Sequence, residues 1–323
     1  MPVLPNSGNY QSTHAVVRLV QITEAHEGQR LDNFLIKYCK GVPKSHLYKA
    51  VRAGQVRVNR GRCGVDYRLK LGDEVRVPPF RMSSTEPKAA PPAKFPVVYE
   101  DDSILVINKP AAVAVHGGSG ISHGVIESLR SANPGLDFLE LVHRLDRETS
   151  GLLMLAKRRQ ALVRLHAMIR EGKIRKLYVA LVQGRLENDR QHIKLPLTKW
   201  LTSSGERRVK VDEQGQAAHT IVNCIERFRN TSLALAELRT GRTHQIRVHL
   251  ASSGHPIVGD TKYGSDQLQQ WWRDHGIKRM MLHARTLAFD HPMTGQRMEL
   301  QADVPVEFER GARLLADSDR ELA

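Results

Sequence analysis

Hydrophobic and polar residues along this chain follow two different spacings, which together predict a protein with both helices and strands. Apolar residues recur at helical spacing near residues 31–38, 43–54 and 159–172. Short apolar or alternating runs bounded by turn residues recur instead between residues 95 and 303, as in antiparallel strands. The pattern therefore predicts an α+β fold with most of its sheet beyond residue 95.

The first 80 residues separate into a tail and a compact basic segment. Residues 1–27 are polar apart from one strand-like run at 15–22, and we expect them to form an N-terminal tail. Residues 28–80 combine two helical runs with two short strands and carry twelve Lys or Arg against four Asp or Glu, a formal charge of +8. This composition predicts a small α/β domain with a basic surface.

A stretch rich in Pro, Ser, Ala and Lys follows and predicts a domain boundary. Residues 81–94 include three prolines, which favour an extended, semi-rigid linker. A second domain is expected over residues 95–310, and the charged residues 311–323 are expected to form a C-terminal tail. Two domains are also what a length of 323 residues favours.

The overall charge narrows the class of partner. The chain carries 49 Lys and Arg against 34 Asp and Glu, a formal net charge of +15. Such a balance favours nucleic acid, or less often an anionic membrane surface. The first residues lack an apolar signal-peptide core, no apolar run reaches transmembrane length, and the three cysteines are too far apart for a zinc motif or a disulfide framework. These features predict a cytoplasmic protein without a membrane partner.

One charged loop between two apolar runs is the strongest candidate for a catalytic centre. Residues 139–142 and 152–156 flank the loop and are expected to form short buried strands. Asp146 lies between Arg144 and Arg147, whose guanidinium charges favour its ionised form. An ionised carboxylate on a loop held by rigid strands is suited to act as a nucleophile or a base. In the structural alternative, Asp146 caps the turn or pairs with one of these arginines.

The order of residues in this loop is more specific than its charge. Residues 143–151 read His-Arg-Leu-Asp-Arg-Glu-Thr-Ser-Gly, and apolar residues and Ala156-Lys157 follow. This segment resembles the signature of the RluA-type pseudouridine synthases. Residues 176–182 and 240–250 resemble two further motifs of the same family, and the resemblance extends over residues 28–310.

The resemblance implies a fold, a reaction and a set of residue roles. The fold is the pseudouridine-synthase fold, a mixed and mainly antiparallel curved sheet with a central cleft. The reaction is the isomerisation of uridine to pseudouridine within RNA after base flipping. Asp146 would act on the ribose, either at the anomeric carbon or through loss of the C2′ proton. Tyr178 would pack against the target base, and Arg144 would fill the space that the base leaves. Arg247 would form a buried bidentate pair with Asp146.

The basic segment resembles a second family, the S4-type RNA-binding domain. The resemblance rests on Gly-Gln-Arg-Leu-Asp-x-Phe-Leu from residue 28, with Pro-Lys-Ser, Val-Arg-Val-Asn and Gly-Asp-Glu-Val further on. In that family the second helix and the following strand face RNA. The candidate RNA contacts that follow are Lys44, Ser45, Lys49, Arg52 and Arg57, with Arg242 of the second domain as a further candidate.

The combination of the two domains also indicates a substrate. The attached basic domain and the His-Gly-Gly-Ser-Gly loop at residues 116–120 favour the family members that modify large-subunit (23S) ribosomal RNA over shorter relatives. The expected partner is therefore 23S ribosomal RNA, before or during assembly of the large subunit. The protein is expected to act as a monomer.

Other classes of function have weaker support. The loop at residues 116–120 lacks the residues of a P-loop and the spacing of a dinucleotide fingerprint, so no cofactor is expected. His143, His244, His249 and His283 match no common zinc spacing, so no metal is expected. A hydrolase would need a Ser or Cys elbow, which we do not find. The remaining alternative is a non-catalytic RNA-binding or ribosome-assembly protein, for which the basic domain alone would suffice.

Three smaller features complete the comparison with the family. Ala112 stands where the family usually has the glycine of Asn-Lys-Pro-x-Gly. Residues 255–264 and 282–284 also fit the family and are interpreted as structural turns and sheet edges around the cleft. Trp271 and Trp272 are adjacent and must point to different faces, so at most one of them stacks on a base.

Overall fold

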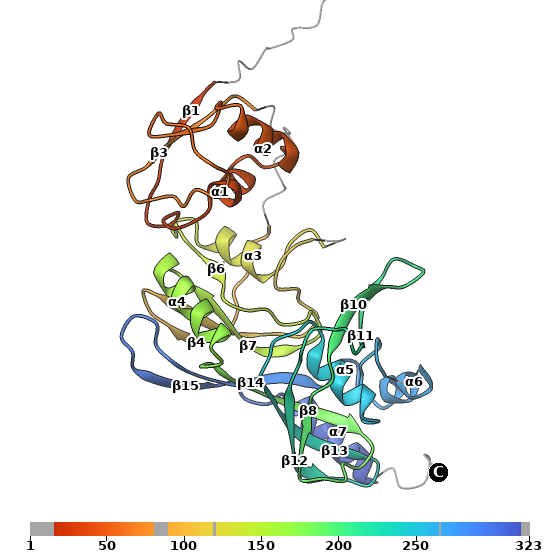
Figure 1. Cartoon of the computed structure of the whole chain (residues 1–323). Coiled ribbons are helices and arrows are strands. Elements are labelled where there is room, and N and C mark those ends of the chain that lie inside the picture. Colours follow the sequence, from red (N-terminus) through yellow and green to blue (C-terminus); the bar gives the residue numbers. More distant parts are fainter. Residues whose placement is uncertain (1–15, 81–89, 119–120, 265, 318–323) are drawn as a thin grey trace, which may run out of the picture. The chain divides into compact units, whose positions relative to one another are not determined.

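The computed structural model describes residues 16–80, 90–118, 121–264 and 266–317. They divide into two compact units with a boundary between Ala89 and Ala90 (Figure 1). The expected tail at residues 1–15 and most of the expected linker, residues 81–89, lie outside the described residues. None of the described helices is long and apolar enough to cross a membrane.

The first unit packs two helices against a small antiparallel sheet. The helices are α1 (Leu31–Tyr38) and α2 (Lys44–Arg52), and the strands are β1 (Arg18–Gln21), β2 (Arg57–Val58) and β3 (Glu74–Val77), in the order β1-β3-β2. Apolar residues at helical spacing on α1 and α2 meet the inward residues of β2 and β3 in one core. The buried members are Ile22, Leu31, Phe34, Leu35, Cys39, Leu47, Ala50, Val51, Val56, Val58, Leu69, Val75 and Val77.

The N-terminal boundary of this unit differs from the expected one. Strand β1 pairs with β3 along its whole length, from Arg18 opposite Val77 to Gln21 opposite Glu74, and Ile22 is buried in the core. Residues 18–27 therefore belong to the first unit, where the sequence predicted a tail. The strand-like run at residues 15–22 is this strand, but its partner lies more than fifty residues further along the chain, so the run alone does not assign it to the first unit.

The second unit is built on a ten-stranded sheet. Its path is β4-β5-β7-β14-β8-β13-β12-β9, with β6 on β7 and β15 on β14. These strands are β4 (Val97–Glu100), β5 (Ile104–Lys109), β6 (Glu140–Leu141), β7 (Ser150–Ala156), β8 (Arg175–Gln183), β9 (Arg190–Ile193), β12 (Thr220–Arg227), β13 (Thr231–Leu238), β14 (Leu282–Asp290) and β15 (Arg297–Gln301). All described pairs are antiparallel except β7 with β14. This agrees with the mixed, mainly antiparallel sheet that the sequence predicted.

Among the described residues, a separate hairpin and five helices complete the second unit. The hairpin consists of β10 (Leu197–Leu201) and β11 (Arg207–Val211), and it projects from the body of the unit (Figure 1). The helices are α3 (Val125–Ala132), α4 (Arg159–Arg170), α5 (Gln245–Ser252), α6 (Asp266–Asp274) and α7 (Val306–Asp317). Helix α7 continues to Asp317 with Ala312 buried, so the C-terminal tail expected from residue 311 begins later than predicted.

The central strands are apolar on both faces because each face is covered. Along β7, Leu153 and Leu155 point into the core beneath α3 and α5, while Leu152 and Met154 point into the core beneath α4. A strand buried on both sides reads as a continuous apolar run, which is why residues 152–156 carry no polar alternation.

A glycine allows the loop before β7 to enter the sheet beside β14. Gly151 pairs with Ala284 in the parallel register and has φ +107°, a conformation that side chains rarely adopt. A Cβ at this position would clash with the backbone of Ala284. The close approach brings the end of the charged loop next to β14, and β8 lies on the far side of β14.

A buried carboxylate in the first unit supplies a test of its stability. Asp32 accepts hydrogen bonds from Nε and Nη2 of Arg30 at 3.2 and 2.9 Å and from the Tyr48 hydroxyl at 2.7 Å. The bonds from Arg30, opposed by burial and assisted by Tyr48, lower the pKa of Asp32 to about 2. Since the unfolded value is about 3.9, this carboxylate contributes roughly 2–3 kcal/mol above pH 4, and the contribution is lost as the pH falls toward 2.

We therefore expect Asp32→Asn to lower the free energy of unfolding by roughly 2–3 kcal/mol at pH 7 and by about half as much at pH 3. Urea unfolding of the full-length protein at both pH values measures the difference. Glu24→Gln, at an exposed position of the same unit, is the matched control and should change stability by less than about 0.5 kcal/mol. A deficit of equal size at both pH values would contradict the assignment.

Candidate active site

Segments from several parts of the second unit meet at one pocket. The loop at residues 142–149 supplies Arg144 and Asp146, strand β8 supplies Tyr178, and helix α5 with the preceding loop supplies Arg242 and Arg247. The other lining residues are Leu145, Thr149, Leu238, His244, Gln245, Ile246 and Leu282. The residues with an assigned catalytic, base-flipping or RNA-binding role in the second domain therefore lie around the same cavity, although they come from segments far apart in the sequence.

The backbone of the loop that carries Asp146 is held from several sides. The N–H of Thr149 donates to the carbonyl of Asp146 at 3.1 Å and closes the turn. The N–H of Met154 donates to Nε2 of His143 at 3.1 Å. Burial lowers the pKa of His143 to about 4, so the imidazole stays neutral and keeps the lone pair that accepts this bond. His143 is thus a structural part of the loop.

A buried lysine ties this loop to its neighbour. Nζ of Lys109 donates to the carbonyls of Pro110, Val113 and Arg147 at 2.7, 2.8 and 3.1 Å. The turn that brings two of these carbonyls to the lysine passes through Ala112 at φ +65°, the left-handed conformation that glycine adopts without strain. The alanine at this position therefore takes up the backbone shape expected for the family glycine.

Arg247 lies at the centre of the polar network, but its main partner is not the one predicted. Its Nε and Nη2 donate to Oδ2 and Oδ1 of Asp260 at 2.7 and 2.8 Å, so the bidentate partner is Asp260. Asp146 receives one bond, from Nη1 to Oδ2 at 3.1 Å. The prediction of an Arg247–Asp146 contact is right, whereas its bidentate form is wrong.

The two carboxylates of this network differ in how far they are buried. Arg247 is 3% exposed and Asp260 is 1% exposed, while the side chain of Asp146 is 22% exposed and faces the pocket. Burial alone would lower the pKa of Arg247, but the bonds and charge of Asp260, with Asp146, raise it above its ordinary value. Asp260 is therefore the structural carboxylate, and Asp146 is the accessible one.

The arginines next to Asp146 in the sequence do not hold it. Arg147 turns to Glu148, with Nε at 2.7 Å from Oε1. Arg144 is exposed at the pocket. The structural alternative, in which Asp146 pairs with one of these two residues, is therefore not what the structure shows.

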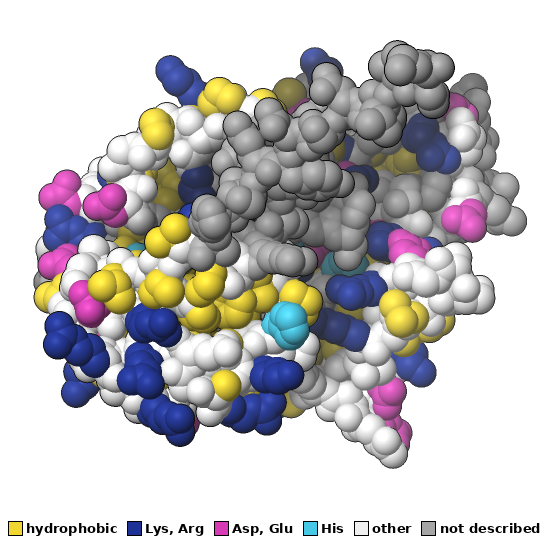
Figure 2. Space-filling view, turned by 90° about the horizontal axis from the view of Figure 1, so that it is seen from above, with side chains coloured by type: hydrophobic (Ala, Val, Ile, Leu, Met, Phe, Trp, Pro, Cys, Tyr) yellow, Lys and Arg dark blue, Asp and Glu magenta, His cyan; other side chains and the backbone are white. Residues whose placement is uncertain are grey.

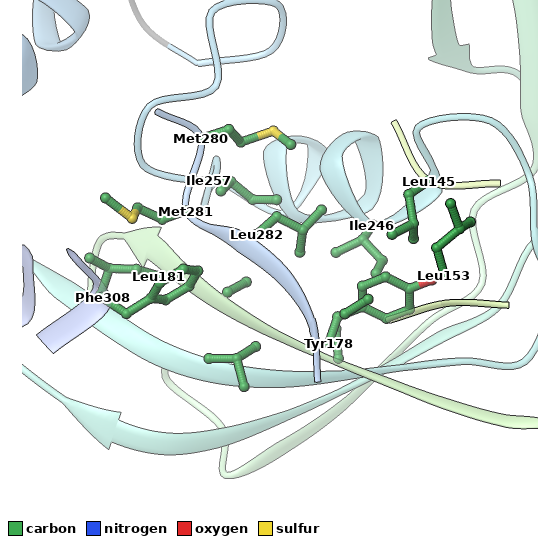
Figure 3. Packing of buried hydrophobic residues seen from close by; sticks show 14 of the residues in the cluster. Leu145, Leu153, Tyr178, Leu181, Ile246, Ile257, Met280, Met281, Leu282 and Phe308 are labelled. Carbon is green, nitrogen blue, oxygen red and sulfur yellow. The ribbon is translucent and has the colours of Figure 1, made fainter. Parts of the chain in front are cut away.

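Tyr178 forms an apolar wall of the pocket next to Asp146. Its ring lies against Ile246, and its hydroxyl end points toward Leu145 and Leu153 (Figure 3). Burial, and then the charge of Asp146, raises the pKa of this phenol above its ordinary value. The side chain is therefore neutral at physiological pH and presents a flat aromatic surface.

Sequence reasoning missed three residues of the site. Asp260 and Tyr263 belong to the segment interpreted as structural turns, and the sequence raises only a metal-ligand role for His244, which its spacing does not support. In the structure Asp260 holds Arg247, and the Tyr263 hydroxyl lies 2.7 Å from Nδ1 of His244. The available signal was the Gly-Asp-x-x-Tyr-Gly sequence itself, in which an acidic residue and a tyrosine stand three positions apart between two glycines.

The histidines considered as metal ligands have other contacts. His249 lies between the Thr220 hydroxyl and the Leu195 carbonyl, each at 2.9 Å, and Nδ1 of His283 lies 2.8 Å from the Ser150 hydroxyl. Among the described residues, no group of three or more His, Cys, Asp or Glu is placed to hold a metal ion.

The remaining candidates are not among the residues that line the pocket. Trp272 is buried and Trp271 packs against the core and stacks on His275 at 3.9 Å between centroids, so both adjacent tryptophans contribute to packing. The basic candidates of the first unit are all exposed on α2 and β2: Lys44, Ser45, Lys49, Arg52 and Arg57. Lys and Arg side chains are also spread widely over the face seen in Figure 2.

Comparison with known proteins bears directly on this arrangement. Residues 103–252 match the family model described as RNA pseudouridylate synthase, and residues 29–75 match the S4 domain. The chain is 47% identical over 300 residues to ribosomal large subunit pseudouridine synthase C of Yersinia pestis, covering 90% of this chain and 93% of that protein.

The chain belongs to the RNA pseudouridylate synthase family. The protein of the same name from Escherichia coli K12 is 46% identical over 303 residues, covering 91% of this chain and 95% of that protein. Among solved structures, human RNA pseudouridylate synthase domain containing 1 superposes with a TM-score of 0.55 at 28% identity, covering 66% of this chain and 86% of that one. Both family resemblances drawn from the sequence are confirmed.

The buried network of this family member gives a prediction for Arg247. Arg247→Ala would leave Asp260 buried without its cation, which costs roughly 3–5 kcal/mol, and would remove the donor to Asp146. We expect a clearly lower melting temperature together with loss of turnover. Arg247→Lys should restore part of the stability but little of the turnover, because one ammonium cannot reproduce three directed bonds.

Differential scanning calorimetry and pseudouridine formation on the same samples make the measurement. Arg144→Ala is the matched control, since this arginine also lines the pocket but is exposed and should leave the melting temperature unchanged. An Arg247→Ala variant with wild-type stability would show that the buried pair is not structural.

Proposed function

We propose that this protein isomerises specific uridines to pseudouridine in large-subunit ribosomal RNA, with Asp146 as the catalytic carboxylate. The observation that carries the proposal is the position of Asp146: it is accessible in the pocket, held through one oxygen by the buried Arg247, and bordered by Tyr178. The names of the curated relatives support the choice of substrate, and the S4 domain supports an RNA partner.

The chemistry requires the uridine to leave its stack, because base pairing buries the atoms that react. Asp146 then acts on the ribose, either by attack on the anomeric carbon or by removal of the C2′ proton, and the bond from C1′ to N1 breaks. The released base turns within the pocket and rejoins C1′ through C5, which displaces Asp146 from C1′ in the first route and is followed by return of the proton from Asp146 to C2′ in the second. The proton leaves C5 and N1 gains one, so no oxidant, reductant or group donor is needed.

The walls of the pocket suit such a rotation. Tyr178, Ile246 and Leu282 offer apolar surface on which a flat base can turn without losing directed hydrogen bonds. Arg144 is exposed next to this surface and long enough to take the position of the flipped base in the RNA stack. Arg242, also exposed at the pocket, can contact a neighbouring phosphate.

The first unit would add affinity rather than chemistry. Its exposed residues on α2 and β2 offer a basic surface for the phosphate backbone: Lys44, Ser45, Lys49, Arg52 and Arg57. The described residues that line the pocket all belong to the second unit of one chain, which favours activity as a monomer. A ribosomal RNA substrate favours a cytoplasmic protein that acts before or during assembly of the large subunit.

Replacement of the catalytic carboxylate is the direct test. Asp146→Asn keeps the shape of the side chain but can act neither as a nucleophile nor as a base, so we expect no turnover with RNA binding nearly unchanged. Release of tritium from C5 of uridine in a ribosomal RNA fragment measures the reaction. Asp137→Asn, an exposed carboxylate ahead of the loop, is the control. Turnover by Asp146→Asn would sink the assignment, and inactivity of the wild type would favour a non-catalytic RNA-binding protein.

Removal of residues 1–89 tests the role of the first unit. The second unit has its own cores and all pocket residues, so we expect it to fold and to retain turnover at high RNA concentration. Its affinity should fall, and the slope of log affinity against log salt should drop by about 0.7–0.9 for each phosphate that the shortened protein no longer touches. Binding of both proteins to one RNA fragment across a salt series makes the comparison. Equal slopes would show that the first unit does not contact RNA.

A further inference from the structure

His244 has an unusual place in the pocket. It directly precedes α5 and has φ +53°, a left-handed backbone conformation that is uncommon for residues other than glycine. Strained residues of this kind persist where the surrounding structure requires them, and they cluster at functional sites. The conformation directs the ring to Asp146, with Nε2 at 3.8 Å from Oδ1, and the roles assigned above to the pocket residues do not account for it.

The hydrogen bonds behind the ring determine which nitrogen carries the proton. The backbone N–H of Val209 on β11 donates to the Tyr263 hydroxyl oxygen at 3.0 Å, and a backbone N–H can only donate. The hydroxyl lies 2.7 Å from Nδ1 of His244, and donation of its proton to this nitrogen uses both of its hydrogen-bonding roles and leaves the ring proton on the side of the Asp146 carboxylate. Nδ1 is then the acceptor, and the proton of the neutral ring is on Nε2, which faces Asp146.

The neutral ring agrees with its surroundings. Burial lowers the pKa of His244 below its ordinary value, with the nearby charge of Asp146 acting against this and that of Arg247 adding to it. The ring is also stacked edge to face with Tyr263, at 5.6 Å between centroids and 71° between planes. Its orientation is therefore set by a phenol that itself packs beneath the Arg247 guanidinium, 5.1 Å from the ring centre.

We propose that His244 is a positioning residue for the reaction: its Nε2–H donates to Oδ1 of Asp146, and Tyr263 sets the tautomer that makes this donation available. Arg247 holds only Oδ2. A carboxylate held through one oxygen can still rotate about its Cβ–Cγ bond, whereas a donor on each oxygen sets the plane in which its lone pairs point. The inference rests on the proposed function, because it assigns His244 a role in that same reaction.

The separation of 3.8 Å between Nε2 and Oδ1 is longer than a hydrogen bond. Catalytic contacts are often long in the absence of substrate and shorten in the complex with it. Binding of the flipped nucleotide on the pocket side of Asp146 would press the carboxylate toward the ring, so that the second donor engages when the reaction needs it.

Two substitutions at one position separate the donor from the rest of the ring. His244→Asn tolerates the left-handed backbone, but its amide is too short to reach Asp146, and we expect kcat to fall about 10- to 100-fold with little change in KM. His244→Gln places an amide N–H where Nε2 stood and should recover most of that loss. A purely structural role for the ring would give parallel changes in melting temperature and no rescue by Gln.

Tyr263→Phe tests the tautomer. The ring under Arg247 is kept and only the hydroxyl is removed, so we expect kcat to fall about 3- to 10-fold in the wild-type background. In the His244→Gln background there is no ring nitrogen to accept a hydrogen bond from the Tyr263 hydroxyl, so Tyr263→Phe should have no further effect on kcat. In both backgrounds the Val209 N–H loses its acceptor, which should lower the melting temperature by the same amount. The difference in kcat between the two backgrounds therefore measures only the effect that passes through His244.

The outcomes are distinct. If the wild-type protein releases tritium from C5 and the Asp146→Asn variant releases none, the proposed function is established independently of His244. Given that result, wild-type kcat in His244→Asn, no rescue by Gln, or an equal effect of Tyr263→Phe in both backgrounds each overturns the inference. Inactive wild-type protein would instead overturn the proposed function.

Discussion

The buried guanidinium of Arg247 is the interaction on which the geometry of the pocket depends. Two of its nitrogens serve Asp260, which compensates the cation inside the protein, and Nη1 alone reaches Asp146. A lone arginine paired with Asp146 would cancel the charge of the reacting group. Because a second carboxylate already balances the cation, Asp146 is held by a strong, directed donor while the cluster keeps a net negative charge at its accessible end.

The segment that delivers Arg247 is folded by its own side chains. Oε1 of Gln245 accepts from the Thr240 hydroxyl at 2.7 Å and from the N–H of Arg242 at 3.0 Å, while Nε2 donates to the His219 carbonyl at 3.0 Å. These bonds draw the loop into a turn whose last residue is the left-handed His244, and α5 begins at the next position. The order of residues in this motif thus determines the shape of the loop, the residue at which α5 begins and the position of Arg247 in the first turn of that helix.

Much of this site could be predicted from the sequence, and the missing parts share one cause. The spacing of apolar residues predicts β7, β8 and α4 because these elements are periodic over several residues, and the family signatures single out Asp146, Tyr178 and Arg247. The sequence predicts a structural turn around Asp260, and in part this is correct, since its Oδ1 accepts from the N–H of Lys262 at 2.9 Å. A turn-forming and an ion-pairing aspartate look the same locally. Only contacts between distant segments distinguish them, as they also do for β1 and its partner β3.

The loop that carries Asp146 is held mainly through backbone groups, which leaves its reactive side chain to the pocket. Three ammonium protons of Lys109 match three carbonyls, one of them that of Arg147 in this loop, and burial lowers the pKa of Lys109 to about 7. Loss of one proton would leave one of these carbonyls without its donor, so the anchor is strongest in the charged form. Burying the Lys109 ammonium costs desolvation free energy that an apolar residue at this position would not. It does, however, fix two backbone segments at once without placing any side chain between Asp146 and the cavity.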